Sequence, residues 1–276
     1  MVERVQDSPL KKPQKARESS RKFLHLIPMI VVALAFVGVW ELVFRLRIVQ
    51  PTFLFPGPAA VANSLYDLWK QQVLFPAIGR TLARLGVGFL ISLVLGSILA
   101  FLMVHFATFG KGIQPYVLGL QTFPSIAWVP LSLIWFGFSE AALLFVTIVG
   151  SLFSITVSFA DALRTVPPVY LRAARNMGSD GMDLILRVTV PAALPHLISA
   201  MKVGWSFAWR SLIGAEVVFA SVGLGSLLSQ GRENIHYEQV MGIMIAILAI
   251  GVLVDRVLFS RTHEWASRRR GLIPSR

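Results

Sequence analysis

Six long apolar segments dominate this sequence and restrict it to one class of fold. Crossing about 30 Å of hydrocarbon takes roughly 20 residues of helix, and each segment has about that length. Because every backbone polar group must be paired within lipid, apolar segments this long indicate helices. We therefore expect an all-α polytopic membrane protein with six transmembrane helices, at residues 24–44, 79–106, 113–136, 140–160, 192–219 and 238–258.

Composition and charge support this class and suggest an orientation. The chain is 55% hydrophobic and 14% charged, whereas about a quarter of the residues in soluble domains are charged. Most of its 26 Lys and Arg residues lie near the two ends or in the interval 161–194. The positive-inside rule therefore predicts that both termini and this interval are cytoplasmic, although Arg45 and Arg47 fall on the other side. The absence of cysteine excludes disulfides and thiolate metal sites.

Four regions follow from the same pattern. Residues 1–22 are predicted to form a disordered basic cytoplasmic tail near anionic headgroups, with a nucleic-acid-binding arm as the alternative. Residues 23–78 hold the first transmembrane helix, which we interpret as a retained anchor, and an amphipathic helix at the outer surface. Residues 79–260 form the core domain, with a cytoplasmic loop at 161–191. Residues 261–276 form a second basic cytoplasmic tail.

The second and third segments carry packing signals. Gly86, Gly88 and Gly96 are expected to mark faces where neighbouring helices approach closely. In the third segment, Pro124 and Pro130 predict a broken helix. Freed backbone carbonyls are tolerated at membrane depth only beside protein or a water-filled cavity, so the break is expected to face one of these.

The interval 161–194 is the one long polar stretch between two apolar segments in the second half of the chain. Pro167 and Pro168 predict the start of a helix, Gly178 its end, and Ser179-Asp180 the cap of a second short helix. A narrow apolar face on these helices is expected to dock into a partner's groove. It comprises Leu171, Ala174, Met177, Met182 and Ile185.

A spaced motif within this interval resembles a known family. Arg172-Ala173-Ala174, then Gly178, then Val188-Thr189-Val190-Pro191 is similar to the cytoplasmic EAA loop of ABC-importer permeases. That pattern is Glu-Ala-Ala, three residues, Gly, nine residues and Ile-x-Leu-Pro. The spacing matches throughout, with Arg172 in place of Glu, Val188 in place of Ile and Val190 in place of Leu. The resemblance implies that Arg172, Ala173, Ala174, Gly178, Val188 and Pro191 belong to a loop that couples to an ATPase.

Further motifs narrow the resemblance. Phe55-Pro56-Gly57-Pro58, the string Gln121–Pro130, Trp135-Phe136-Gly137 and the run Pro191–Pro195 resemble permeases of the nitrate, sulfonate, taurine and bicarbonate group. The resemblance covers residues 55–258 and implies a core permease domain with the type I ABC importer fold. It also implies a homodimer in a bacterial inner membrane, on two cytoplasmic ATP-binding subunits and supplied by an extracytoplasmic solute-binding protein.

No catalytic constellation is visible in the sequence. The five histidines are scattered without metal-ligand spacing, and neither a Gly-x-Ser-x-Gly motif nor a phosphate-binding Walker loop occurs. We predict no catalytic residues, no metal and no cofactor. In an ATP-driven importer, hydrolysis would then belong to a partner chain.

Charged residues inside the fifth segment are candidates for function, because ionisable groups at membrane depth usually face a cavity or a partner. Arg210 would suit a small oxyanion, which a guanidinium holds by a forked pair of hydrogen bonds. The alternative is a structural ion pair, with Glu216 or with another helix. Glu216 matches an Ala-Ala-Glu position of the resembled family, and we favour a structural role for it.

Eight residues are candidates for a translocation path, with packing or helix-carbonyl hydrogen bonding as the plainer alternative. They are Gln121, Thr122, Phe123, Ser125, Trp128, Trp209, Arg210 and Glu216. Glu140 is interpreted as a gate or a helix cap at the outer mouth. Gly223-Leu224-Gly225 resembles a short turn near the outer gate, with an ordinary loop as the alternative.

The sequence thus predicts the permease subunit of an ABC importer for a small anion of the sulfonate, nitrate or bicarbonate type. Two other classes stay open. A secondary transporter would more often show an inverted repeat, and we find none. A membrane scaffold that recruits a cytoplasmic protein through the same loop is the other.

Overall fold

The turn at residues 55–58 folds back on the carboxyl-terminal end of the first helix. The computed structural model describes residues 26–219 and 221–260, so the predicted tails at 1–22 and 261–276 lie outside it. By chain contacts the protein divides into two units, residues 1–62 and 63–276. In the first unit, helix α2 (Leu26–Arg45) covers the first predicted segment. Trp40 Nε1 donates to the carbonyl of Pro56 at 3.0 Å, and Gly57 leaves room for the ring of Phe44.

Helix α3 (Pro58–Lys70) confirms the amphipathic helix predicted after this turn. Pro58 is its first residue, where a missing N–H costs nothing. Leu68 is buried in a cluster with Ala77, Leu224 and Ile243.

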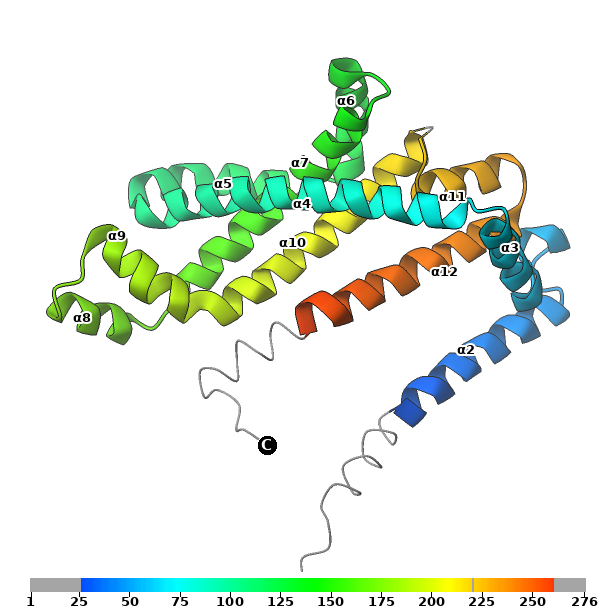
Figure 1. Ribbon diagram of the computed structural model, residues 1–276, viewed down its shortest axis with the longest axis horizontal. Coiled ribbons are helices and arrows are strands. Elements are labelled where there is room, and N and C mark those ends of the chain that lie inside the picture. The colour runs from blue at the N-terminus through cyan, green and yellow to red at the C-terminus, as the bar shows by residue number, and fades with distance from the viewer. Residues whose placement is uncertain (1–25, 220, 261–276) are drawn as a thin grey trace, which may run out of the picture. The chain divides into compact units, whose positions relative to one another are not determined.

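Three helices form the main core of the second unit: α4 (Leu74–His105), α7 (Glu140–Arg164) and α10 (Val190–Val218). In Figure 1, α4 lies across both of the others. The buried core side chains come from all three helices and include Leu85, Phe89, Val146, Ile155 and Leu212. This core holds the central segments of the chain together.

Glycines set the closest approaches in this core, as the sequence predicts for Gly88 and Gly96. A Cβ on Gly88 would meet Thr147 at 2.8 Å, and one on Gly96 would meet Ile155 at 2.8 Å. Gly86 faces open space instead, so the prediction of a packing role there is wrong. It lies on another side of α4, about 200° from Gly88.

The third predicted segment is a bent pair of helices. Helix α5 (Ala107–Thr122) and the stretch Ser125–Phe136 meet at 96°. This stretch consists of a 3-10 turn (Ser125–Trp128) and helix α6 (Val129–Phe136). The predicted break is confirmed. Pro124 does not continue the helix that ends at Thr122, so the pair is either one broken span or a re-entrant loop.

Four unbent helices are long and apolar enough to cross a membrane within the described residues, and the bent pair raises the number to five. The four are α4, α7, the stretch Gly181–Val218 and the stretch Tyr237–Val257. The prediction was six, and α2 is not in this set. Helix α11 (Leu224–Glu233) precedes α12 (Tyr237–Val254), which a π-helical turn extends over Asp255–Ser260.

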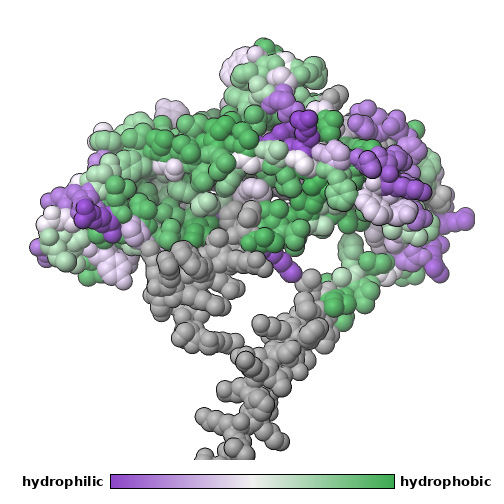
Figure 2. Space-filling view, in the orientation of Figure 1, coloured by the Kyte–Doolittle hydropathy of each residue, from purple (hydrophilic) through white to green (hydrophobic). Residues whose placement is uncertain are grey.

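The loop between α7 and α10 is helical. It contains α8 (Pro168–Asn176), α9 (Gly181–Leu184) and a π-helical turn at Ile185–Thr189 that runs into α10. Figure 2 shows hydrophobic side chains gathered over α4 and α5, and hydrophilic side chains at the end formed by α8 and α9.

Candidate functional site

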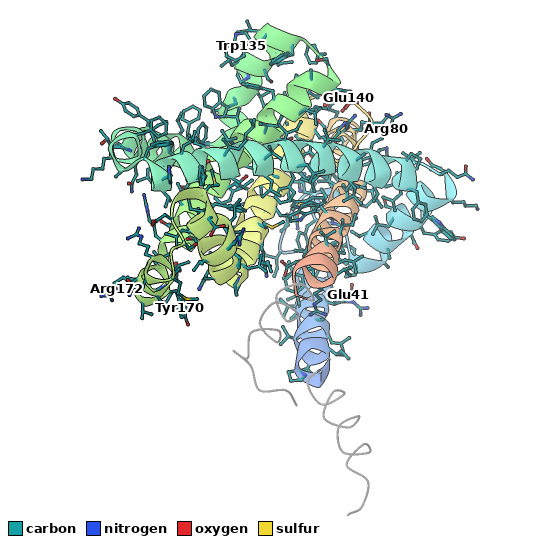
Figure 3. The ribbon with its side chains drawn as sticks, turned by 60° about the vertical axis from the view of Figure 1, so that its left-hand side comes forward. Glu41, Arg80, Trp135, Glu140, Tyr170 and Arg172 are labelled. Atoms are coloured by element: carbon teal, nitrogen blue, oxygen red, sulfur yellow. The ribbon has the colours of Figure 1, made fainter. Side chains whose placement is uncertain are left out.

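An arginine and two glutamates join three of the core helices. Arg84 of α4 donates from Nη1 to Glu216 Oε1 of α10 at 2.7 Å, and from Nε to Glu140 Oε2 of α7 at 2.6 Å. Arg84 and Glu216 are buried, whereas the Glu140 side chain is 58% exposed. In Figure 3, Glu140 and Arg80 lie close together where α7 begins beside α4.

The Glu216 carboxylate has partners on both oxygens. Thr81 donates its hydroxyl to this carboxylate at 2.9 and 3.0 Å, and the backbone N–H of Gly225 donates to Oε2 at 3.1 Å. Thr81 in turn accepts from the N–H of Leu224 at 3.0 Å. The first turn of α11 is therefore fastened to α4 and α10. This supports the structural interpretation of Glu216, since no part of its side chain meets solvent.

Only glycine fits at two positions around this carboxylate. A Cβ on Gly223 would lie 2.5 Å from the Glu216 carboxylate, and one on Gly225 would lie 2.7 Å from the carbonyl oxygen of Ile213. The predicted Gly-Leu-Gly turn is thus a packing element that leads into a helix, rather than an ordinary loop.

The alternative ion pair between Arg210 and Glu216 is wrong, because Glu216 pairs with Arg84 and lies on another side of α10. Arg210 instead donates from Nε to the carbonyl of Ser206 at 3.2 Å and lies 4.5 Å from the centre of the Phe207 ring. Within the described part of the chain, no carboxylate lies within ion-pair distance of Arg210.

Polar residues form a continuous stripe along the exposed side of α10. Lys202, Ser206 and Arg210 recur at intervals of four residues, which places them on one face. Between residues 87 and 98 the exposed face of α4 is apolar and consists of Val87, Leu90, Ile91, Val94, Leu95 and Ile98. Since polar side chains rarely face lipid, the two faces have different environments.

The break between α5 and α6 lies beside α10, next to this stripe. A Cβ on Gly150 of α7 would collide with Ser125 and with Ser211 of α10, and one on Gly214 would lie 3.4 Å from Ile126. Thr122 and Phe123 are exposed, and Gln121, Ser125 and Trp128 are half-buried. The structure therefore brings the break and the Arg210 stripe next to each other.

The aromatic candidates have packing partners. Trp128 makes edge contacts with Phe123 and Phe145, at ring separations of 5.3 and 6.4 Å. Trp209 packs in the main core and against Gly251 of α12, 3.5 Å from the position of a Cβ there. Both tryptophans are half-buried, so each presents one edge outward.

In the 161–191 loop, the predicted start and end of α8 are confirmed. Pro168 is its first residue, and Gly178 has φ +85°, the left-handed conformation that ends helices. The predicted cap of α9 is only half right. Asp180 occupies the cap position without a side-chain hydrogen bond, and Ser179 donates to Asp183 at 2.7 Å.

The apolar face predicted for docking is partly wrong. Ala174 is buried, and Leu171 packs against the chain's own cluster of Ala162, Val166 and Ala193. Helix α8 therefore uses part of that face to hold the loop on α7 and α10. The large apolar side chains left exposed are Val169, Tyr170, Met177, Met182 and Leu186.

Arg172, Ala173 and Arg175 are exposed beside these apolar side chains, and Val188 and Pro191 are half-buried where the loop joins α10. Figure 3 shows Tyr170 and Arg172 extending from α8 away from the helix bundle. A protruding helix with apolar and cationic side chains has the composition of a protein-docking surface.

Sequence reasoning missed Arg84 and Thr81. The structure buries Arg84 inside α4. The available signal was a charge within an apolar helix, which requires a partner. No group of three or more His, Asp or Glu side chains in the described residues could hold a metal ion.

The chain is similar to known membrane transport proteins. Residues 92–270 match the family described as binding-protein-dependent transport system inner membrane component. A putative ABC transporter permease of Methanocaldococcus jannaschii is 31% identical over 227 residues, which cover 80% of this chain and 84% of that protein.

Two further relatives carry substrate names. A putative aliphatic sulfonates transport permease of Bacillus subtilis is 26% identical, over 95% of this chain and 93% of its own. A nitrate import permease of Leptolyngbya laminosa is 24% identical, over 90% of this chain and 94% of its own. Among solved structures, a chain of the MetNI methionine ABC transporter in an inward-facing conformation superposes with a TM-score of 0.62. The superposition covers 71% of this chain and 96% of the MetNI chain at 19% sequence identity, so the two chains share a fold.

Proposed function

Since this chain belongs to the family of binding-protein-dependent transport system inner membrane components and is the permease subunit of an ABC importer, we propose that two copies form the pathway for a small oxyanion. The chain is a transport subunit, and ATP hydrolysis takes place on a separate subunit. The fold is the type I importer fold, which the MetNI chain shares.

The observation that carries the proposed path is the exposed polar stripe of α10 beside the break in α5–α6. Irregular backbone is not tolerated against lipid, and neither is an arginine without a carboxylate partner. In the single chain both features are exposed. A second copy that faces them across a water-filled space satisfies both requirements.

The proposed solute is an anion held weakly at Arg210. Its Nη atoms make no hydrogen bond to a described residue, so the fork of the guanidinium is free to meet two oxygen atoms. Two relatives are named for aliphatic sulfonates and nitrate, which are anions of this kind. Gln121, Thr122, Ser125 and Trp128, at the break, supply the wall next to Arg210.

The proposed coupling element is α8 with the turn at Gly178. ATP-driven closure of the ATPase subunits moves α8, and α8 moves α7 and α10 because Leu171 packs on both. Arg172, where the resembled pattern has Glu, brings a positive charge to this contact, so the ATPase groove is expected to offer a carboxylate there. Tight solute selection belongs to the solute-binding protein that serves this family.

We place the chain in an inner membrane with both termini and α8 on the cytoplasmic side. The basic residues near the ends of the chain and in the α7–α10 loop support this orientation.

The test is purification of the tagged chain from detergent with its candidate ATPase, followed by reconstitution with the binding protein. We expect the ATPase to co-purify and uptake of nitrate or ethanesulfonate to require ATP. Tyr170→Ala should weaken co-purification at least tenfold, the size of an interface hot spot. The matched control Tyr116→Ala, also at an exposed tyrosine, should not. Uptake driven by an ion gradient with no partner would overturn the proposal.

A further inference from the structure

A cleft of about 460 Å³ lies between α10 and α12. Its volume falls within the range of small-molecule sites, and an inorganic anion such as nitrate would fill only a small part of it. The two walls differ in chemistry. The α10 wall is polar and aromatic, whereas along α12 itself the wall is apolar and consists of Ile247, Leu248, Gly251 and Val252. A solute that uses the whole cleft therefore needs an apolar part.

Arg210 is the cation of this cleft that is best placed to hold an anionic group. Lys202 is paired with Asp255 at 3.0 Å, and Arg256 makes an interaction of its own. Arg210 donates from Nε to the carbonyl of Ser206, while its Nη atoms donate to no described residue. The fork of the guanidinium is therefore available for the oxygen atoms of a solute.

A second donor lines the cleft next to Arg210 in the chain. The ring of Trp209 packs in the main core, but its Nε1–H donates to no described residue and is not sealed from solvent. A Cβ on Gly251 would lie 3.5 Å from this nitrogen, so the indole N–H edge lies at the α12 wall. An indole nitrogen can only donate, and a tryptophan in such a position usually finds an acceptor. The cleft thus offers two unused donors, from Arg210 and from Trp209.

Gly251 leaves space beside this N–H. Glycine is unfavourable inside a helix relative to alanine. A Cβ at this position would make only ordinary contacts, at 3.5 Å from Nε1 and 3.9 Å from Cε2 of Trp209, so close packing does not require a glycine. A larger side chain would instead cover the N–H and narrow the cleft. Glycine at this position therefore keeps the donor accessible.

We propose that the cleft binds an anion that carries a short apolar chain, and that Trp209 and Gly251 set the preference for such solutes. The anionic group accepts hydrogen bonds from the Arg210 fork and from Trp209 Nε1, and the chain lies along Leu248 and Val252. This inference rests on the proposed function, because it names the class of anion held at Arg210. An inorganic anion uses only the charged end of the cleft and binds more weakly.

The absence of cysteine allows a direct test on the permease itself. Ser206→Cys places a single thiol in the cleft, one turn from Arg210. Its modification by uncharged N-ethylmaleimide is followed by mass spectrometry of the full-length chain, in liposomes with its ATPase. Nitrate, methanesulfonate and butanesulfonate are the protecting solutes at constant ionic strength, and butanol is the uncharged control. Because the thiol reports binding to the permease, the selectivity of a solute-binding protein does not enter.

We expect butanesulfonate to protect the thiol at a concentration about tenfold or more below that of methanesulfonate, since each buried methylene adds about two- to fourfold in affinity. Nitrate should protect no better than methanesulfonate. In the Ser206→Cys background, Trp209→Phe keeps a ring and loses the N–H, so both sulfonates should protect about threefold or more weakly. Gly251→Leu should remove the difference between the two sulfonates. Gly251→Ala, whose methyl group fits, should reduce this difference and serves if Gly251→Leu fails to assemble.

Each contrary outcome has a distinct meaning. If the two sulfonates protect equally while Arg210→Gln abolishes protection by both, the preference for a chain is wrong and the anion site at Arg210 stands. If butanol protects as well as butanesulfonate, the cleft binds apolar molecules of any charge and the inference is wrong. Leu90→Cys, on the apolar face of α4, is the matched lipid-facing reference. If no anion protects, or if the Ser206→Cys thiol reacts as slowly as this reference, the inference and the anion site both fail.

Discussion

Arg84 and Glu216 form an ion pair of 2.7 Å between α4 and α10, and both side chains are shielded from solvent. The two residues are 132 positions apart in the chain. The pair also fixes α11, because the same carboxylate accepts from Gly225. These contacts join α10, which carries the proposed path, to α4 and α11.

Removal of Glu216 should therefore destabilise the folded protein. Glu216→Ala leaves a buried guanidinium with the partly exposed Glu140 as its remaining carboxylate partner among the described residues, and breaking a buried pair costs about 3–5 kcal/mol. The measurement is the free energy of unfolding in detergent. Glu140→Gln should cost less, about 1 kcal/mol or below, because Glu140 is 58% exposed. Equal costs for the two variants would contradict the buried role of Glu216.

Gly225 should not tolerate a side chain. Gly225→Ala would place a methyl group 2.6 Å from the Glu216 Cβ and 2.7 Å from a backbone oxygen, and overpacking of this kind costs about 1–3 kcal/mol. Thermal unfolding of the purified protein is the measurement. Gly86→Ala is the matched control, since it faces open space within α4 and should stabilise by up to about 1 kcal/mol. The account of the turn is wrong if both substitutions have the same sign.

Gly178 should matter for coupling rather than for packing. Its φ of +85° is unfavourable for a side chain by roughly 1–2 kcal/mol, although nothing lies within 4 Å of a Cβ there. Gly178→Val should therefore shift the orientation of α8 and raise the ATP hydrolysed per solute imported, with normal membrane insertion. The control is Gly112→Ala, another position in open space. An unchanged ratio would remove the coupling role.

Arg210 should affect transport more than assembly. Arg210→Gln should lower uptake of nitrate or ethanesulfonate by about tenfold, which corresponds to loss of a charge-assisted hydrogen bond. Arg210→Lys should restore part of the activity, because it keeps the charge and loses the fork. Arg232→Gln on α11 is the control. Unchanged uptake in Arg210→Gln would refute the anion site.

The sequence alone predicted the features that depend on local chemistry. The helices of most apolar segments, the break at Pro124 and the ends of α8 at Pro168 and Gly178 all follow from backbone preferences of proline and glycine or from the length of apolar runs. These signals lie within a few residues of the feature that they predict.

The features that depend on distant partners were not predictable. Arg84 pairs with Glu140 and Glu216, and nothing in its neighbourhood indicates either one. The inward direction of Leu171 on α8 depends on where α7 and α10 converge, so the apolar face appeared free in the sequence. The pairing of Lys202 with Asp255 likewise spans two helices.

The central claim is that α8 faces the cell interior and binds the ATPase. Ala173→Cys places a single thiol on the exposed side of α8, in an otherwise cysteine-free chain. The measurement is its labelling by a membrane-impermeant maleimide in inside-out and right-side-out vesicles. We predict labelling only in inside-out vesicles, and protection when the ATPase is bound. Labelling from the outer side would contradict the account, because no cytoplasmic ATPase could then reach α8.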